Sequence, residues 1–580
     1  MKRLLLLIFL FVVAFLSLAR LVVPKKTGPH LLALVPRESF CVLELHAPKH
    51  NLSALARTPL GRSLINLDWP YLLASMSDKS KQAADFHRLA RLTSLVTTVM
   101  AAPRSPLLDT GVVALIPPET GQDTPEPVAG TLLLLGRLHS TNSFWRLSSC
   151  LEKAAHLQLE KKEIFNGHPV FRYQMPDAGP FYVGQYLDVV IVSPVREAVT
   201  QAISLARAGV GANNFSLFGD DFFIRTRGKQ TKNLLLTAYV NAWALERLSP
   251  PVRQSEYPLS LLSGLTGQGL DKILFTWRKE GKIETISSHC RFRRKDLPAL
   301  ARLCSLRQPV LNPELSAVPA GITAYFWSNW FSPASWWQMY LGRVGREYKK
   351  YQKIADSVLE KYLSLSMSEL TSLFEYEWSV FVTDIKQSAF LPVPRLCLRL
   401  GIIDPGRLAS LMEKNIAALP HRLDIVADTK VISLIMAGGL MEPSYSFIDH
   451  NLWLFDGYDL VEKFLRPGAA RLVDDSAFRG VVENPKNITA NLQLFVRVQP
   501  VIQSLLEFYS SLGTVSSAHP ATTQSRRYKR VLERLVLPLA KNLAGIESLF
   551  VSASVHGNEF ESRLRLRQSP NAAKGEEENE

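Results

Sequence analysis

The chain has 580 residues, of which 47% are hydrophobic and 21% charged, and its formal net charge at pH 7 is +15. This composition is typical of a globular protein and excludes an intrinsically disordered chain, and the length predicts two or more domains. The five cysteines form no CxxC pair, which excludes a disulfide-rich scaffold and a zinc ribbon.

The first predicted element is an apolar run at residues 4–19, preceded by Lys2 and Arg3. A cationic start followed by such a run is typical of a signal peptide or a signal anchor. Cleavage after Ala19 and retention as a single-pass anchor both fit the pattern. We therefore expect residues 1–28 to be a hydrophobic helix that directs the chain to the inner membrane and its bulk to the periplasm.

The rest of the chain predicts the same order of elements twice. Val35-Pro36 precedes a strand-like segment at residues 40–45, and Val318-Pro319 precedes another at residues 322–327. Strand and helix patterns of similar length then follow in both halves, and each half closes with a hairpin pattern.

This correspondence predicts repeats at residues 31–293 and 311–567. We expect the fold class to be α+β, a tandem duplication of an antiparallel sheet with helices packed on one face, preceded by the N-terminal hydrophobic helix. Residues 569–580 are polar and rich in glutamate, which predicts a disordered acidic tail.

Each half contains a pair of aspartates ahead of an apolar segment, Asp220-Asp221 and Asp474-Asp475. Such pairs could serve acid–base chemistry or hold a hard cation. An aspartate before a helix also accepts hydrogen bonds from the first N–H groups, which contributes about 1 kcal/mol. Because a structural cap is expected in both halves, we interpret Asp221 and Asp475 as helix caps.

The Val-Pro openings, the aspartate landmark before Tyr239-Val240-Asn241 and the N-terminal membrane segment resemble a family of uncharacterised bacterial envelope proteins, catalogued as a domain of unknown function. The resemblance extends from about Val35 to Arg567. It implies bacterial origin, a leader or anchor and a large exported region, and it implies no catalytic residues.

Other motifs predict neither catalysis nor a metal site or cofactor. Glu44, His46 and His50 give too few ligands for a metal, and they form no HExxH pattern. Residues 209–213 contain two glycines but follow a helix pattern, which favours a helix C-cap over a phosphate loop.

The densest aromatic segment contains four tryptophans that could bind a ligand or a partner: Trp327, Trp330, Trp336 and Trp337. Packing in the core or between domains is the alternative interpretation of these side chains.

Residues 347–363 predict a basic amphipathic helix, with apolar side chains at Tyr351, Ile354, Val358 and Tyr362 and lysines around them. Such a helix covers a sheet or contacts anionic headgroups. The expected partners are the inner membrane, anionic lipid and envelope proteins, and export excludes nucleic acid.

We therefore predict a non-enzymatic binding or scaffolding module tethered in the bacterial envelope. The alternative is a carrier of lipid or another hydrophobic ligand, with an apolar groove between the two repeats. An exported hydrolase has the least support in the sequence.

Overall fold

The structure is a computed structural model, and it describes residues 29–46, 58–66, 107–116, 131–138, 144, 158–175, 179–209, 215–228, 233–242, 269–293, 305–330, 332–335, 337–338, 348–363, 365–387, 392–417, 419–439, 441–466, 468–482, 484–516 and 537–569. The predicted leader at residues 1–28 lies outside these residues, as does the predicted tail beyond Ser569. Among the described residues no helix is long and apolar enough to cross a membrane.

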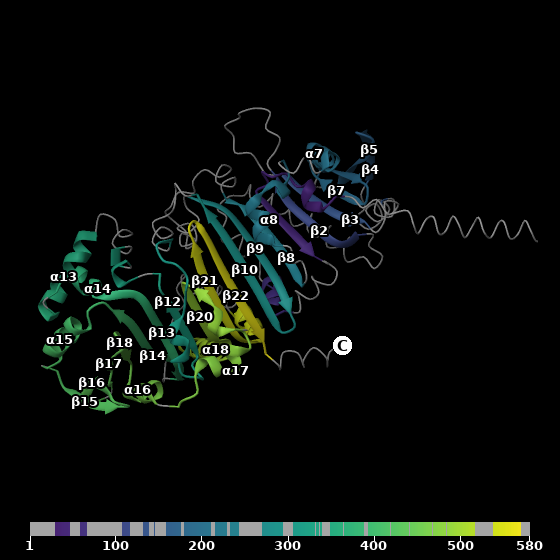
Figure 1. The fold of residues 1–580 in the computed structure, drawn as a ribbon. Helices are drawn as coiled ribbons and strands as arrows, with labels where there is room; N and C mark the ends of the chain where they lie inside the picture. The colour runs from purple at the N-terminus through teal and green to yellow at the C-terminus, as the bar shows by residue number, and fades with distance from the viewer. Residues whose placement is uncertain are drawn as a thin grey trace, which may run out of the picture. The chain divides into compact units, whose positions relative to one another are not determined.

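The chain divides into two compact units (Figure 1). Unit 1 comprises residues 1–49 and 84–225, and unit 2 comprises residues 50–83 and 226–580.

Unit 1 is an antiparallel sheet with a long helix on it. Its elements are η1 (Leu31–Leu34), β1 (Cys41–His46), β2 (Leu107–Ile116), β3 (Thr131–Leu138), β4 (Gln158–Phe165), β5 (His168–Met175), β6 (Gly179–Tyr186), β7 (Val189–Ser193), α7 (Arg196–Ala208), η4 (Leu217–Gly219) and, at the boundary with unit 2, α8 (Asp221–Arg227). The strands pair in the order β1-β2-β3-β7-β6-β5-β4, and every pair is antiparallel.

The pattern of buried side chains explains how α7 packs on this sheet. Alternate residues of β3 are buried, as a half-covered strand requires. On α7 the buried side chains recur at helical spacing and include Val199 and Ile203. Gly184 of β6 lies beneath them, and a Cβ at this position would stand only 2.6 Å from Val199 Cγ1. The missing side chain therefore allows the helix to approach the sheet closely.

Unit 2 contains the longer sheet. Its elements in the first part of the chain are α3 (Pro59–Asn66), β8 (Leu234–Asn241), β9 (Leu270–Glu280), β10 (Ile283–Phe292), β11 (Val310–Leu311), η6 (Pro313–Ser316), β12 (Ala324–Ser328), α13 (Tyr348–Leu363), α14 (Met367–Ser372), β13 (Phe374–Gln387), β14 (Pro392–Ile402), α15 (Pro405–Ile416) and β15 (His421–Val426). The elements that follow are β16 (Thr429–Leu434), η8 (Ala437–Gly439), β17 (Ser444–Ile448), β18 (Asn451–Phe455), α16 (Tyr458–Leu465), η9 (Leu472–Asp474), α17 (Ser476–Arg479), η10 (Pro485–Asn487), β19 (Thr489–Ala490), β20 (Leu492–Arg497), α18 (Val498–Ser516), α20 (Leu537–Leu543), β21 (Ile546–His556) and β22 (Glu559–Gln568).

The strands of unit 2 pair in the order β8-β9-β10-β22-β21-β20-β12-β13-β14-β18-β17-β16-β15, again antiparallel throughout. Only β11 and β19 form a separate two-stranded sheet among the described strands. The order of pairing from β12 to β15 corresponds strand by strand to the order from β1 to β4 in unit 1.

Helices cover both faces of the unit 2 sheet. Cys397 and Phe455 lie opposite each other on β14 and β18, and they belong to a core closed by α16. Leu400 and Leu452 lie opposite each other on the same two strands, and they belong to a second core closed by α14 and α15. Because adjacent residues of a strand point to opposite faces, the two cores lie on opposite sides of one sheet.

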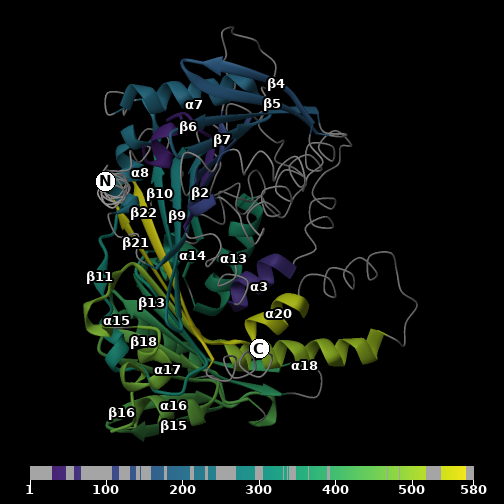
Figure 2. The same ribbon diagram turned by 90° about the vertical axis from the view of Figure 1, so that its right-hand side faces the viewer.

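A third core lies under α18, α20 and α3, which pack together in Figure 2. Leu60 of α3 packs there against a cluster that includes Ile502 of α18, Ala540 of α20 and Leu566 of β22. The segment that contains α3 therefore belongs to unit 2, although it precedes most of unit 1 in the sequence.

The predicted fold class was wrong in its arrangement. The fold is dominated by antiparallel strands, and the hairpin expected to close a first, separate sheet continues into the second, because β10 pairs with β22 from Ile283↔Arg567 to Arg291↔Glu559 (Figure 1). The expectation of helices on one face was also wrong for unit 2. No hydrophobic N-terminal helix occurs in the described part of the chain. Local patterns indicate strands, but they do not indicate which strands pair.

Candidate functional site

The tryptophans predicted as a ligand surface have different positions. Trp327 is fully buried in the core closed by α16, and its Nε1 donates to Glu377 Oε1 at 3.1 Å. Trp330 and Trp337 are half-buried, and Trp336 lies outside the described residues. The structure thus gives Trp327 a packing role.

One of the two predicted helix caps is correct, and the other lies one residue earlier than predicted. At the start of α17, Asp475 is the N-cap and its Oδ1 accepts from Ala477 N at 2.9 Å. At α8 the accepting side chain is Asp220, whose Oδ1 lies 3.0 Å from Phe223 N, and Asp221 is already the first residue of the helix. The interpretation of Asp221 as the cap is therefore corrected to Asp220, because only the residue before the first turn can reach the free N–H groups.

A buried polar network lies beside Trp327. Arg399 pairs with Glu314 and, at 3.3 Å, with Glu377, and Ser379 donates to the Glu314 carboxylate. Burial lowers the pKa of Arg399 to about 10. Because Arg399, Glu314 and Ser379 are all buried, the network fixes strands β13 and β14 against η6 and offers no surface to a substrate.

The remaining motifs give no centre of chemistry. His46 Nε2 lies 3.4 Å from the Glu44 carboxylate, and His50 lies outside the described residues. Within the described ranges, no group of three or more His, Cys, Asp or Glu side chains is arranged to hold a metal ion. Gly209 is the C-cap residue of α7 and has φ 61, a backbone conformation that favours glycine. Cys290 is a free thiol, and burial raises its pKa to about 11, which makes it unreactive.

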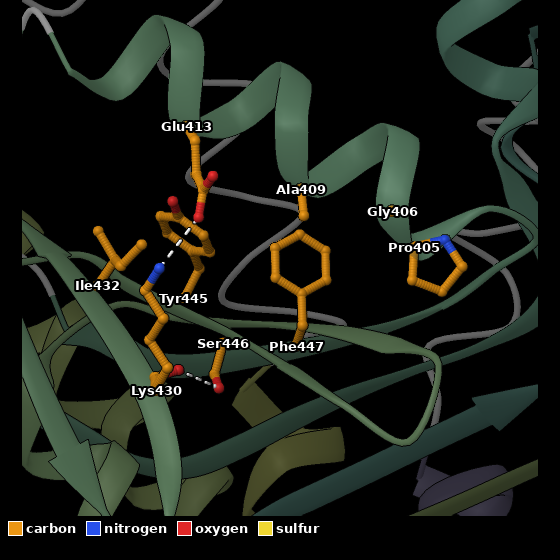
Figure 3. Close-up of a pocket in the computed structure, with 9 residues that line it drawn as sticks. All are labelled: Pro405, Gly406, Ala409, Glu413, Lys430, Ile432, Tyr445, Ser446 and Phe447. Atoms are coloured by element: carbon orange, nitrogen blue, oxygen red, sulfur yellow. Dashed lines mark hydrogen bonds and ion pairs between the residues drawn. The ribbon is translucent and has the colours of Figure 1, made fainter.

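A pocket of about 340 Å³ lies in unit 2 between α15 and the β16–β17 hairpin (Figure 3). Its lining residues are Pro405, Gly406, Ala409 and Glu413 from α15, Lys430 and Ile432 from β16, and Tyr445, Ser446 and Phe447 from β17. Ala409 stands above the ring of Phe447, and its small side chain and the lack of one at Gly406 leave the space open. The floor is apolar, because Ile432 and Tyr445 lie opposite each other and Phe447 continues the same face.

Several polar side chains lie at one end of this pocket. Lys430 Nζ lies 3.0 Å from Glu413 Oε1, and both side chains are more than half exposed. The Tyr445 side chain lies beside this ion pair and points toward α15 in Figure 3. Ser446 donates from Oγ to the Lys430 carbonyl oxygen at 2.8 Å, so its hydroxyl is engaged by the backbone.

Tyr445 has an unusual environment for a polar side chain. It is only 4% exposed, and its hydroxyl oxygen has no hydrogen-bond partner among the described residues. Burial, and secondly the Glu413 carboxylate, raise the pKa of Tyr445 to about 12, so the phenol stays protonated at neutral pH. A buried hydroxyl is normally satisfied by a partner.

The arrangement supports binding, since the lining combines an apolar floor with a few converging polar groups. The sequence predicted strands and helices in this half of the chain, but it gave no indication that the helix at 405–416 packs across a hairpin at 429–448. Only the glycine and alanine on one face of that helix hinted at open space.

No family model matches the chain, and no curated protein matches it. The solved structures that match include crystal form I of TP0453, at 8% identity, covering 46% of this chain and 80% of that chain with a TM-score of 0.22. Crystal form IV of TP0453 matches at 11% identity, covering 48% of this chain and 85% of that chain with a TM-score of 0.25. At such TM-scores the likeness carries no argument about fold or function, so the resemblance to an envelope family stays a prediction.

Proposed function

We propose that the protein is a non-enzymatic binding module, tethered in the bacterial envelope, whose unit 2 binds a small amphipathic molecule between α15 and the β16–β17 hairpin. The buried Tyr445 hydroxyl, which has no partner among the described residues, carries this proposal. Leaving such a group unsatisfied costs about 1–3 kcal/mol, and a ligand oxygen at this position removes the cost.

The size and lining of the pocket define the ligand. A volume of about 340 Å³ is near the lower end of the range for small-molecule sites, which is roughly 300–1,000 Å³. Ile432 and Phe447 favour an apolar body of modest length. Because the Tyr445 phenol stays protonated, it favours a carbonyl, ester or ether oxygen at the end of that body.

The exposed ion pair favours a polar head on the same ligand. At the rim, the Glu413 carboxylate can accept a hydrogen bond and the Lys430 ammonium can donate one. An uncharged head with hydroxyl groups can therefore bond to either side chain. A monoacylglycerol has all three parts: an apolar chain, an ester carbonyl and free hydroxyls. This ligand site lies within unit 2, so the proposal does not use the groove between repeats that the sequence suggested.

The experiment measures binding of 1-decanoylglycerol to the purified full chain by native mass spectrometry, beside a lipid extract of the same sample. We expect one bound molecule per chain. Ala409→Trp fills the space above Phe447 and should abolish binding, whereas Ser410→Trp, on the exposed side of the same helix, should leave it intact. Tyr445→Phe should weaken binding about 2- to 12-fold, the value of one neutral hydrogen bond.

Equal binding to the Ala409→Trp variant and the wild type would remove the pocket from consideration. A clean apo mass in every condition, together with protein partners recovered after gentle crosslinking, would favour the scaffolding role.

A further inference from the structure

Helix α13 presents three apolar side chains to solvent. Tyr351, Ile354 and Val358 recur at helical spacing, and their exposed fractions are 38%, 52% and 49%. These three residues are called the apolar stripe below. An amphipathic helix in a soluble domain normally turns such a stripe toward the core. Burying it against another surface would remove apolar area from water, which is favourable.

The other side of the helix makes the contacts within unit 2. Helix α13 lies beside α14 and α15 (Figure 1), and Asp356 Oδ1 accepts from Met367 N, the first residue of α14, at 2.8 Å. Asp356 and Leu359 are half-buried on this side. The helix is therefore held in place by one face while the apolar stripe stays on the other.

Positive charges flank the apolar stripe. Lys350 precedes Ile354 by four positions and Lys361 follows Val358 by three, so both share the face of the stripe, and all of Lys350, Lys353 and Lys361 are exposed. Glu360 is the one exposed acidic residue among the described side chains of this helix. The exposed face thus combines apolar side chains with net positive charge.

We propose that this face of α13 docks on the anionic surface of a lipid bilayer, with the apolar stripe among the headgroups and the lysines on lipid phosphates. The charge is complementary, and basic helices with an apolar face bind such surfaces in their plane. A second copy of the chain is a poor occupant, because pairing the same face would bring the lysines of both copies together. The proposal uses neither the pocket nor its ligand.

The test is hydrogen–deuterium exchange of the full chain with an excess of lipid nanodiscs. One set of discs contains phosphatidylcholine alone, and the other contains equal parts phosphatidylcholine and phosphatidylglycerol. We expect slower exchange over residues 348–363 only with phosphatidylglycerol, and loss of this protection at a salt concentration on the order of 1 M, where the screening length falls to about 3 Å. Retention of the chain by either disc reports the membrane tether separately.

Variants locate the effect. Each of Lys350→Gln, Lys353→Gln and Lys361→Gln should reduce the ratio of docked to undocked helix about fivefold. Ile354→Ser with Val358→Ser should abolish the protection, and folding should be unaffected because both side chains are exposed. Lys541→Gln, an exposed lysine on α20, is the matched control and should change nothing.

Two results would overturn the proposal. The first is exchange over α13 that is identical in both kinds of disc. The second is protection that persists in the triple lysine variant or in the absence of lipid, which would assign the face to a second copy or to a protein partner.

Discussion

Replacing Tyr445 with phenylalanine should stabilise the protein in the absence of ligand. The substitution removes one hydroxyl that is buried and has no partner among the described residues, and it leaves the ring in place. An unsatisfied buried hydroxyl costs about 1–3 kcal/mol, so the free energy of unfolding should rise by roughly that amount. Few substitutions in a core raise stability, which makes the sign of the effect informative.

Tyr325 provides the matched control. It is also fully buried in unit 2, but its hydroxyl accepts from Asn312 Nδ2 at 2.6 Å. Tyr325→Phe leaves this amide with one acceptor fewer, and we expect a loss of about 1–2 kcal/mol. The same chemical change should thus have opposite signs at the two positions.

Urea denaturation of the full chain, followed by tryptophan fluorescence, measures both variants. A chain with two units can unfold in more than one transition, so the comparison is made on the transition that both substitutions shift. A Tyr445→Phe protein that loses as much stability as Tyr325→Phe would refute the reasoning, since the hydroxyl would then have a partner in the folded state. Added 1-decanoylglycerol should narrow the gap between Tyr445→Phe and the wild type.

Three further substitutions test other parts of the structure. Burial raises the pKa of Glu284 above its ordinary value of 4.5, so on raising the pH the unfolded chain loses this proton before the folded chain does. The free energy of unfolding should therefore fall as the pH rises above 4.5. The Glu284→Gln variant should show a smaller fall, measured as urea midpoints. Arg399→Met leaves Glu314 buried without its partner and should cost about 3–5 kcal/mol by urea denaturation, most of which Glu314→Gln should restore in the double variant. Gly184→Ala brings a Cβ against Val199 and should lower stability by about 1–3 kcal/mol, measured as a lower urea midpoint.

Strands were predictable where the alternation of apolar residues and the turn that joins two strands lie within one short segment of the sequence. The hairpin pattern predicted to close the second half corresponds to β21 and β22. These patterns depend on residues two positions apart, which the sequence displays directly. The cap at Asp220 was missed by one residue, because two adjacent aspartates offer the same chemistry and only the backbone decides which one precedes the helix.

The site was not predictable for a different reason. The pocket requires α15 to lie across a hairpin that begins more than ten residues after the helix ends, and the gap exists because Ala409 happens to stand above Phe447. Nothing in either segment alone indicates this meeting. Trp327 belongs to the aromatic segment that was predicted to bind a ligand, but its large side chain fills the core.

The pairing of β10 with β22 means that the sheet of unit 2 cannot finish folding until the end of the chain has been synthesised. Glu284 of β10 bonds to Gln568 at 3.0 Å across 284 positions. At a translation rate of about 5–20 residues per second, the edge of β10 waits roughly 15–60 s for its neighbour. A bare strand edge is a template for wrong pairing. A chain that is exported unfolded and folds only after its synthesis is complete would avoid this wait. A chain truncated before residue 559 lacks β22, so the edges of β10 and β21 would both stay unpaired.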